Sequence, residues 1–130
     1  LNLISGAPHH FVTTSMANQA DLLKREGDPF LEIHPDDATA RHIQDGHLVT
    51  VANARGYCHL RAVVTDAIRP GVVSTPKGFW QKLDPWKNGA KGSGSNGSNG
   101  RNVNWLTSDA LADLAGQSTF HSSRVWVSPQ

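Results

Sequence analysis

The chain has 130 residues, of which 38% are hydrophobic, and its formal net charge is +1. This length suits one domain, residues 1–130, with a modest core, and the 12 glycines and 7 prolines predict short elements joined by many turns. The charge is too low for a nucleic-acid-binding protein, and no apolar stretch approaches the roughly 20 residues that cross a bilayer. We therefore expect no nucleic-acid partner and no membrane association.

The single cysteine, Cys58, excludes an internal disulfide and is compatible with a reducing compartment. Residues 1–4 contain neither a methionine nor a charged region, so they do not resemble a secretory signal. We therefore expect a cytoplasmic location and a chain that was cut from a longer protein.

The first part of the chain is predicted to form a strand, a polar loop and a helix. Residues 1–5 alternate weakly between apolar and polar side chains and are predicted to form the strand. Residues 6–14 are polar and rich in hydrogen-bond donors. Residues 17–26 suit a helix, with Ser15 as its candidate N-cap and Gly27 as its stop.

Residues 30–33 form an apolar run that predicts a strand, which stops at Pro35 because proline cannot donate to a β-ladder. The acidic residues behind Pro35 suit a helix N-terminus, where carboxylates cap free N–H groups. This short helix is expected to turn Ala38 and Ile43 inward and to end near Gly46.

Three further strands are predicted between residues 48 and 76. Residues 48–51 are rich in β-branched side chains, and a turn at 53–56 leads into the alternating stretch 57–66. Residues 72–75 form another strand that ends before Pro76. The alternation of 57–66 predicts four inward-facing side chains: Cys58, Leu60, Ala62 and Val64.

Residues 88–100 are predicted to be a flexible linker, because their glycines, serines and asparagines cannot bury apolar area. Residues 92–97 match the pattern G-x-G-x-x-G, but neither a strand precedes them nor a helix follows, so we reject a dinucleotide-binding motif.

Residues 108–115 fit a short helix that stops at Gly116, and residues 124–127 fit a closing strand. Six or seven short strands with helices between them favour a β-barrel.

The spacing of the histidines and the position of the single cysteine support no independent catalytic or metal site. The seven histidines include no His-x-His or His-x-x-x-His pair, and we interpret His34 as a structural residue that hydrogen-bonds to the backbone at the strand-to-helix corner. Cys58 faces inward on its strand, where burial disfavours the thiolate.

Residues 77–101 carry an excess of positive charge, with Asp84 as their only acidic residue. This excess indicates either a solvated basic loop or attraction for a polyanionic ligand such as a pyrophosphate. The basic residues are Lys77, Lys82, Lys87, Lys91 and Arg101.

Residues 30–56 read FLEIHPDDATARHIQDGHLVTVANARG. This stretch resembles the C-terminal cofactor-binding domain of the molybdopterin oxidoreductases, the superfamily of formate dehydrogenases, nitrate reductases and dimethyl sulfoxide reductases. The family pattern has an acidic residue, Ile-His-Pro, one residue, Asp-Ala, then Gly-Asp-x-Val and an Arg-Gly turn, and here His47 replaces the second Asp. The resemblance covers nearly the whole chain apart from residues 88–100 and implies a mainly β fold, a double-psi β-barrel with short helices between its strands.

The resemblance also implies which residues meet the cofactor. In that family the loop after the first strand wraps a pterin or its phosphates. An Asn-x-Leu-Thr motif, here residues 104–107, meets the cofactor late in the domain. A residue that follows an aromatic side chain near the last strand also contacts the cofactor. That last residue is often a lysine, and here it is His121. The residues expected to bind the cofactor are Ser5, Gly6, His10, Thr13, Thr14, Ser15, Lys77, Gly78, Asn104, Thr107 and His121.

The chain is therefore interpreted as the C-terminal domain of a molybdenum or tungsten oxidoreductase that carries a bis-molybdopterin guanine dinucleotide cofactor (Mo-bis-MGD). By this resemblance the domain orients the cofactor, the remaining domains of the parent oxidoreductase are its partners, and they supply the protein ligand of the metal. The isolated domain is expected to lack both cofactor and activity. The alternative is a freestanding double-psi barrel, either a decarboxylase, for which no self-cleaving Gly-Ser motif is evident, or a substrate-recognition or protein-interaction module of a chaperone ATPase.

Overall fold

The structure is a computed structural model that describes residues 1–80, 100–114 and 116–130. The linker predicted over residues 88–100 lies outside the described residues except for Gly100, and so does the G-x-G-x-x-G pattern.

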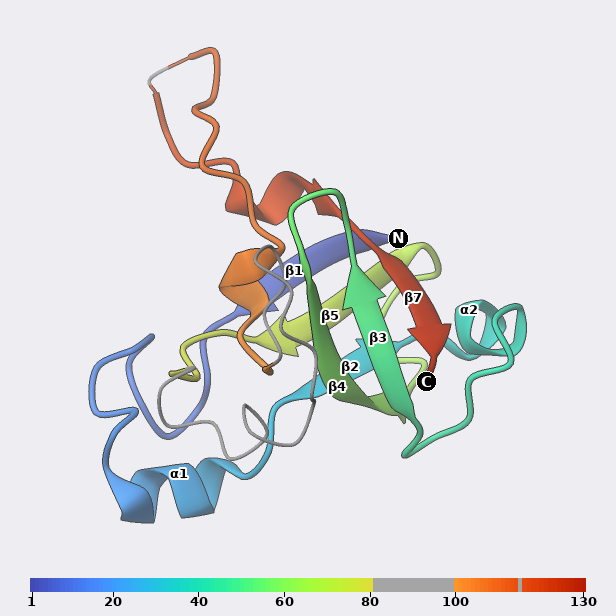
Figure 1. The fold of residues 1–130 in the computed structure, drawn as a ribbon, viewed down its shortest axis with the longest axis horizontal. Coiled ribbons are helices and arrows are strands. Elements are labelled where there is room, and N and C mark those ends of the chain that lie inside the picture. The colour runs from blue at the N-terminus through green and yellow to red at the C-terminus, as the bar shows by residue number, and fades with distance from the viewer. Residues whose placement is uncertain (81–99, 115) are drawn as a thin grey trace.

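The described residues form one sheet of seven strands that curls into a barrel (Figure 1). The strand order is β6-β1-β5-β2-β4-β3-β7. The mainly β fold predicted from the sequence, a double-psi β-barrel with few helices, is confirmed. The strands are β1 (Asn2–Gly6), β2 (Phe30–Ile33), β3 (Leu48–Ala52), β4 (Tyr57–Val64), β5 (Val72–Pro76), β6 (Ser123–Arg124) and β7 (Trp126–Pro129).

The two outer strands of this sheet belong to one continuous segment near the C-terminus. β6 pairs antiparallel with β1, and β7 pairs antiparallel with β3. Between them, Val125 exchanges hydrogen bonds with Leu1, whose N-terminal amine lies 2.9 Å from the Val125 carbonyl oxygen. The predicted closing strand is therefore split in two at Val125, and each half pairs with a different edge, which reduces the unpaired edge that a curled sheet would otherwise expose.

Two pairs of strands run parallel, which needs a crossover connection between them. β1 pairs with β5 from Asn2 and Val72 to Gly6 and Pro76, and β2 pairs with β4 from Phe30 and Arg61 onward. The parallel β1–β5 pair puts the ends of these two strands at the same edge of the sheet, so the loops that follow them start side by side.

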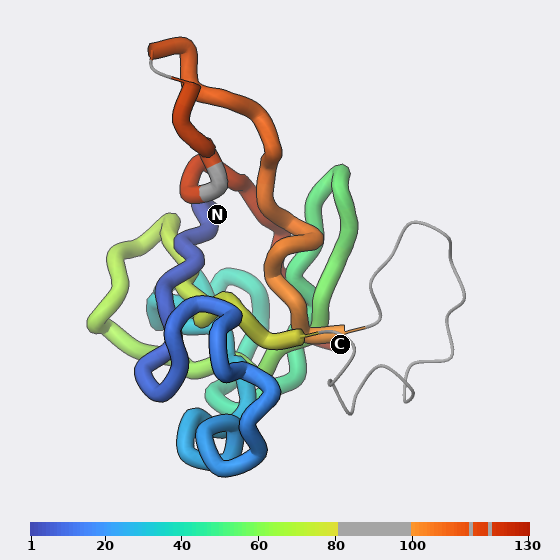
Figure 2. Tube along the Cα trace, turned by 90° about the vertical axis from the view of Figure 1, so that its left-hand side faces the viewer, coloured from blue at the N-terminus to red at the C-terminus, as the bar shows by residue number. Residues whose placement is uncertain are grey.

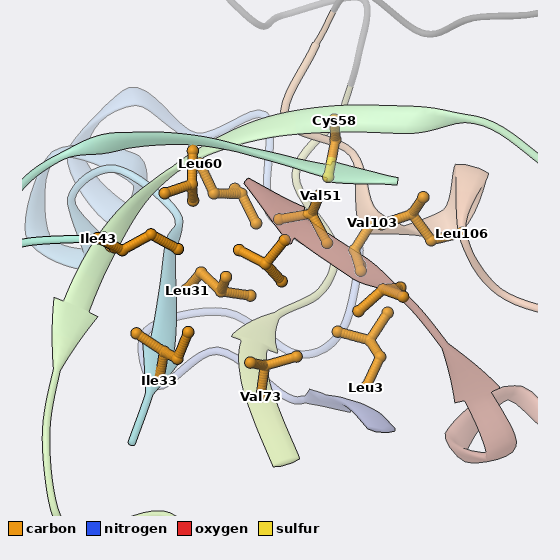
Figure 3. Packing of buried hydrophobic residues seen from close by; sticks show 14 of the residues in the cluster. Leu3, Leu31, Ile33, Ile43, Val51, Cys58, Leu60, Val73, Val103 and Leu106 are labelled. Carbon is orange, nitrogen blue, oxygen red and sulfur yellow. The ribbon is translucent and has the colours of Figure 1, made fainter. Parts of the chain in front are cut away.

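The core is formed by the alternating residues that face into the barrel, as Figure 3 shows. Ile33 and Val49, from the central motif, are both fully buried. On β4 the predicted inward residues Cys58, Leu60 and Ala62 are at most 1% exposed, and the fourth, Val64, is half-buried against the same cluster. Burial of this set at roughly 25 cal/mol per Å² of apolar surface is the main term that stabilises the fold.

The first helix, α1 (Ala20–Glu26), is shorter than predicted. It stops at Gly27 as expected, but it begins three residues late and its N-cap is Gln19 rather than Ser15. The reason is that Met16 has a φ of 67°, which a right-handed helix does not allow, so the chain turns there before the helix starts.

The second helix, α2 (Pro35–Thr39), ends at Thr39 and not near Gly46. His34 is its N-cap, and its Nδ1 accepts a hydrogen bond from the Asp36 amide at 3.2 Å. The structural role predicted for His34 is thus confirmed, and the cap comes from this ring and not from the carboxylates behind Pro35. The next residues tighten into turns and His42 has a φ of 55°, which ends the helix.

Two short 3-10 helices complete the described elements: η3 (Val103–Trp105) and η4 (Phe120–Ser122). None of the helices among these residues combines the length and the apolar character that a membrane crossing requires.

The helix predicted over residues 108–115 is wrong for the described residues 108–114. The segment projects from the barrel as a hairpin-like loop, which Figures 1 and 2 both show. The Ala112 amide donates to the Gln117 carbonyl, and Leu111 pairs with Ser118 in an isolated bridge. Leu111 and Leu114 are 68% and 87% exposed, so a helix here would bury no apolar face, and short helices depend on such packing.

Candidate functional site

Three segments that are far apart in the sequence meet on the side of the barrel opposite α2 (Figure 1). They are the loop 7–17 after β1, residues 77–80 after β5, and residues 102–107 around η3. The first two start side by side because β1 and β5 are parallel, and the Lys77 amide donates to the Gly6 carbonyl at 2.9 Å to extend that pairing.

The three segments form the walls of a pocket of about 210 Å³ that is open to solvent. Its lining residues are Thr13, Thr14, Lys77, Gly78, Asn104 and Thr107, and all six belong to the set predicted from the sequence. About 90 residues of chain separate Thr14 from Asn104, so no local interaction brings them together.

Loop 7–17 is pressed against residues 78–80. Gly78 has a φ of 98°, and a Cβ atom added there would lie 1.8 Å from the Thr13 carbonyl oxygen, so only glycine fits without movement of the loop. The Trp80 Nε1 donates to the Thr14 carbonyl at 3.1 Å. The rings of Phe11 and Phe79 pack edge to face at 5.5 Å, in a second small apolar cluster that also contains Ala17.

The third wall of the pocket is anchored by η3. Val103 and Leu106 are buried in the main core, and between them Asn104 is exposed toward the pocket. The side chain of Asn102 accepts from the Asn104 amide at 3.0 Å, and the Thr107 hydroxyl donates to the Asn104 carbonyl at 3.1 Å. These two bonds fix the backbone of Asn104 while its side-chain amide stays available.

The chemistry of the pocket suits binding of a polar, anionic ligand. Within the part of the chain that the structure describes, the side chains of Thr13, Thr14 and Asn104 make no hydrogen bond, so their donors and acceptors can serve a ligand. Lys77 adds a positive charge, which favours phosphate. Among the residues that the structure describes, the lining has no carboxylate, imidazole or thiol, the usual groups of proton transfer.

The remaining predicted residues lie elsewhere. Ser5, on β1, is buried, and its amide lies 3.5 Å from the Nδ1 of His121 in η4. Gly6 ends the β1–β5 ladder opposite Pro76, and its carbonyl accepts from the Lys77 amide. Ser15 is exposed and forms a backbone turn with Val12.

His10 is turned away from the pocket toward the end of α1. Its Nδ1 lies 2.9 Å from the Glu26 Oε2, and it lines a second hollow, which borders the pocket at Thr13. Partial burial by itself would raise the pKa of Glu26, but hydrogen bonds from the amides of His10 and His9 and from the His10 ring outweigh that effect and lower it.

Two findings concern chemistry outside the pocket. Among the described residues no group of His, Cys, Asp and Glu side chains is arranged to hold a metal ion. Burial raises the pKa of the Cys58 thiol to about 12, so this cysteine is not a nucleophile at neutral pH.

Sequence reasoning missed Trp80 and Glu26, which touch the pocket loop without lining the pocket. Trp80 lies in a stretch noted only as aromatic and basic, and Glu26 looks like an ordinary residue of a surface helix. It also missed Thr75, whose hydroxyl, like that of its strand partner Ser5, is buried with no hydrogen-bond partner among the described residues. The contacts of Trp80 and Glu26 join distant segments, and the burial of Thr75 depends on how the sheet curls, so only the structure reveals these features.

Comparison with known proteins bears directly on this site. A family model described as "Molydopterin dinucleotide binding domain" matches residues 1–124. The chain is 35% identical over 124 residues to a probable oxidoreductase YoaE of Bacillus subtilis and 31% identical over 124 residues to the dimethyl sulfoxide reductase DmsA of Haemophilus influenzae. Each alignment covers 95% of this chain but only 16% and 14% of the relative.

Solved structures show the same fold. The acetylene hydratase of Pelobacter acetylenicus superposes with a TM-score of 0.75 over 98% of this chain and 18% of the larger one, at 20% sequence identity. A biotin sulfoxide reductase of Cereibacter sphaeroides is 44% identical over 84 residues, which cover 62% of this chain and 11% of that protein. With a family model matching almost its whole length, the chain belongs to the molybdopterin dinucleotide-binding domain family.

Proposed function

We propose that this chain is the domain of a larger molybdenum or tungsten oxidoreductase that binds and orients a molybdopterin guanine dinucleotide, in the form of Mo-bis-MGD. The observation that carries the proposal is the pocket in which Thr13, Thr14 and Asn104 present unused hydrogen-bonding groups beside Lys77. Its size and polarity fit part of a pterin or a phosphate better than a whole dinucleotide, so groups outside this pocket would hold the rest, in part from other domains.

The residues present fit such a ligand. Threonine hydroxyls and an asparagine amide can donate and accept at a pterin ring, and a lysine complements a phosphate. Thr13, Thr14, Asn104 and Thr107 would hold the polar groups, and Lys77 the negative charge. The bound cofactor supplies the redox chemistry, whereas this chain contributes position and electrostatics.

The strength of the individual contacts explains why the larger protein is needed. A neutral hydrogen bond contributes about 0.5–1.5 kcal/mol, and one to a charged group about 1.5–3 kcal/mol. A few such bonds give weak binding once the cost of immobilising the ligand is included. The isolated chain is therefore expected to bind the cofactor poorly and to lack activity.

The test is cofactor content in the oxidoreductase that carries this domain. Asn104→Ala should lower the molybdenum or tungsten content and the released pterin severalfold, while the circular dichroism spectrum and the melting temperature stay close to those of the parent. Asn2→Ala, which removes an exposed asparagine on β1 away from the pocket, is the matched control. Full cofactor content in the Asn104 and Thr14→Ala variants would refute the proposal.

A second candidate, a protein-interaction surface, has one observation in its favour. Trp105, Leu111 and Trp126 are 41%, 68% and 71% exposed, so each offers apolar surface that a partner could bury. The remaining domains of a parent oxidoreductase would cover such residues, so this observation also agrees with the first proposal. A freestanding module would instead show its partner contact without any cofactor.

A further inference from the structure

Loop 7–17 holds its pocket residues in a backbone conformation that does not arise by itself. Thr13 and Met16 have φ values of 55° and 67°, in the left-handed region that residues with a Cβ rarely adopt. Such residues persist only where the surrounding structure holds them, and they gather at functional sites. Thr13 is itself a pocket residue, so what holds the loop also determines the pocket.

A single carboxylate holds the beginning of this loop. The Glu26 Oε1 accepts from the His9 amide at 3.1 Å, and its Oε2 accepts from the His10 amide at 2.7 Å. The same Oε2 lies 2.9 Å from the His10 Nδ1. The side chain of Glu26 is 10% exposed and that of His10 is 35% exposed, so the carboxylate is largely covered while its contacts with the loop lie at the protein surface.

The position of Glu26 in its own helix does not explain this arrangement. Glu26 is the last residue of α1, where the negative end of the helix dipole disfavours a carboxylate. The donors from the loop compensate, and they keep the pKa of Glu26 low in spite of its partial burial. An ionised carboxylate only accepts, so the His10 Nδ1 must carry a proton and donate.

We propose that Glu26, together with His10, is a positioning pair for the pocket, which fixes the start of loop 7–17 so that Thr13 and Thr14 meet Gly78 and Trp80. The inference rests on the proposed function, because the position of loop 7–17 matters for the cofactor only if Thr13 and Thr14 bind it. It assigns His10 a role through Glu26 in place of direct contact with a cofactor. The alternative is that Glu26 only stabilises the end of α1.

The first test uses this chain alone and needs no cofactor. Amide hydrogen exchange is measured by NMR for Glu26→Ala, Glu26→Gln and the control Asp66→Asn, an exposed acid without a hydrogen bond from its side chain in the described residues. Glu26→Ala should speed exchange at His9 and His10 at least tenfold. The effect should extend to the amides of Ser15 and Ala17, which bond to Val12 and Thr14 within the loop, and leave the core strands unchanged.

Glu26→Gln keeps one oxygen that accepts, so its exchange rates should fall between those of the parent and Glu26→Ala. Two results would overturn the proposal. If exchange at Ser15 and Ala17 changes less than twofold in Glu26→Ala, the carboxylate acts only locally. If exchange accelerates equally in the core strands, Glu26 contributes to overall stability and not to the position of the loop.

The second test measures cofactor content in the oxidoreductase that carries this domain. Glu26→Ala should lower it severalfold, and Glu26→Gln should recover part of the loss. Asn104→Ala is run in parallel, which separates the two proposals. A loss in Asn104→Ala without one in Glu26→Ala overturns the positioning role alone, whereas full content in both variants overturns the cofactor site as well.

Discussion

Replacing Gly78 by alanine should destabilise the protein far more than an ordinary glycine-to-alanine change. Gly78 has a φ of 98°, and the new Cβ would lie 1.8 Å from the Thr13 carbonyl oxygen and 2.7 Å from its carbon. Both are backbone atoms, so no side chain can rotate away, and loop 7–17 must move as a unit. The change therefore tests whether the loop is packed as tightly as the structure shows.

The magnitude follows from the contacts that such a movement breaks. Holding a non-glycine residue at this φ costs about 1–3 kcal/mol. Displacing the loop also loses the Trp80–Thr14 hydrogen bond, about 0.5–1.5 kcal/mol, and the Phe11–Phe79 ring pair, another 0.5–1.5 kcal/mol. We expect Gly78→Ala to lower the free energy of unfolding by about 2–6 kcal/mol.

Gly71→Ala is the matched control, because Gly71 has a φ of 82° and a Cβ added there meets nothing within 4 Å. It should show the backbone cost alone, about 1–3 kcal/mol. The assay is urea denaturation of both variants, followed by far-ultraviolet circular dichroism, with equal m-values as the check that the transitions are comparable. If the two substitutions cost the same within about 0.5 kcal/mol, the close approach of loop 7–17 to Gly78 is not as we describe it.

Three further predictions concern the barrel. Ile33→Ala and Val49→Ala should each lower the free energy of unfolding by about 2–4 kcal/mol in denaturant melts, because both side chains are fully buried. The control Val63→Ala, on the exposed side of β4, should cost less than about 1 kcal/mol, and losses below about half a kcal/mol at both buried sites would contradict the inward assignment. Cys58 should resist alkylation in the native state, and rapid native-state labelling measured by mass spectrometry would show that the thiol is accessible. Because folding raises its pKa from 9.0 to about 12, the stability that the buried thiol contributes is complete below pH 9 and is lost as the pH rises toward 12. His34→Ala should lower the free energy of unfolding by about 0.5–2 kcal/mol through loss of the α2 N-cap, and equal stability of this variant and the parent would contradict the capping role. His34→Asn, whose side chain can also accept from the Asp36 amide, should recover most of the loss in the same melts.

Local patterns in the sequence determined most of the barrel. The alternation in residues 57–66 depends only on the two-residue period of a strand, so it identified the buried Cys58, Leu60 and Ala62. Pro35 and Gly27 act through their own backbone chemistry, so they marked where a strand and a helix stop. The long motif over residues 30–56 indicated the family, because its spacing is specific.

Helices were harder to predict from the sequence, because short helices take their stability from packing rather than from propensity. Residues 108–115 have a suitable composition, yet Leu111 and Leu114 are mostly exposed and the described part of the segment folds as a loop. The turn at Met16 likewise delays the start of α1 until Ala20. The left-handed φ of Met16 is held by the contacts of loop 7–17, which a local sequence pattern does not indicate.

The pocket itself was decided by tertiary structure. The sequence indicated which residue types belong to it, but the parallel pairing of β1 with β5 is what brings Thr14 beside Lys77, and the burial of Val103 and Leu106 is what turns Asn104 toward both. The same pairing left His10 and His121 outside, each bonded to another part of the chain. Contacts of this kind depend on how distant segments close the barrel, so no window of neighbouring residues encodes them.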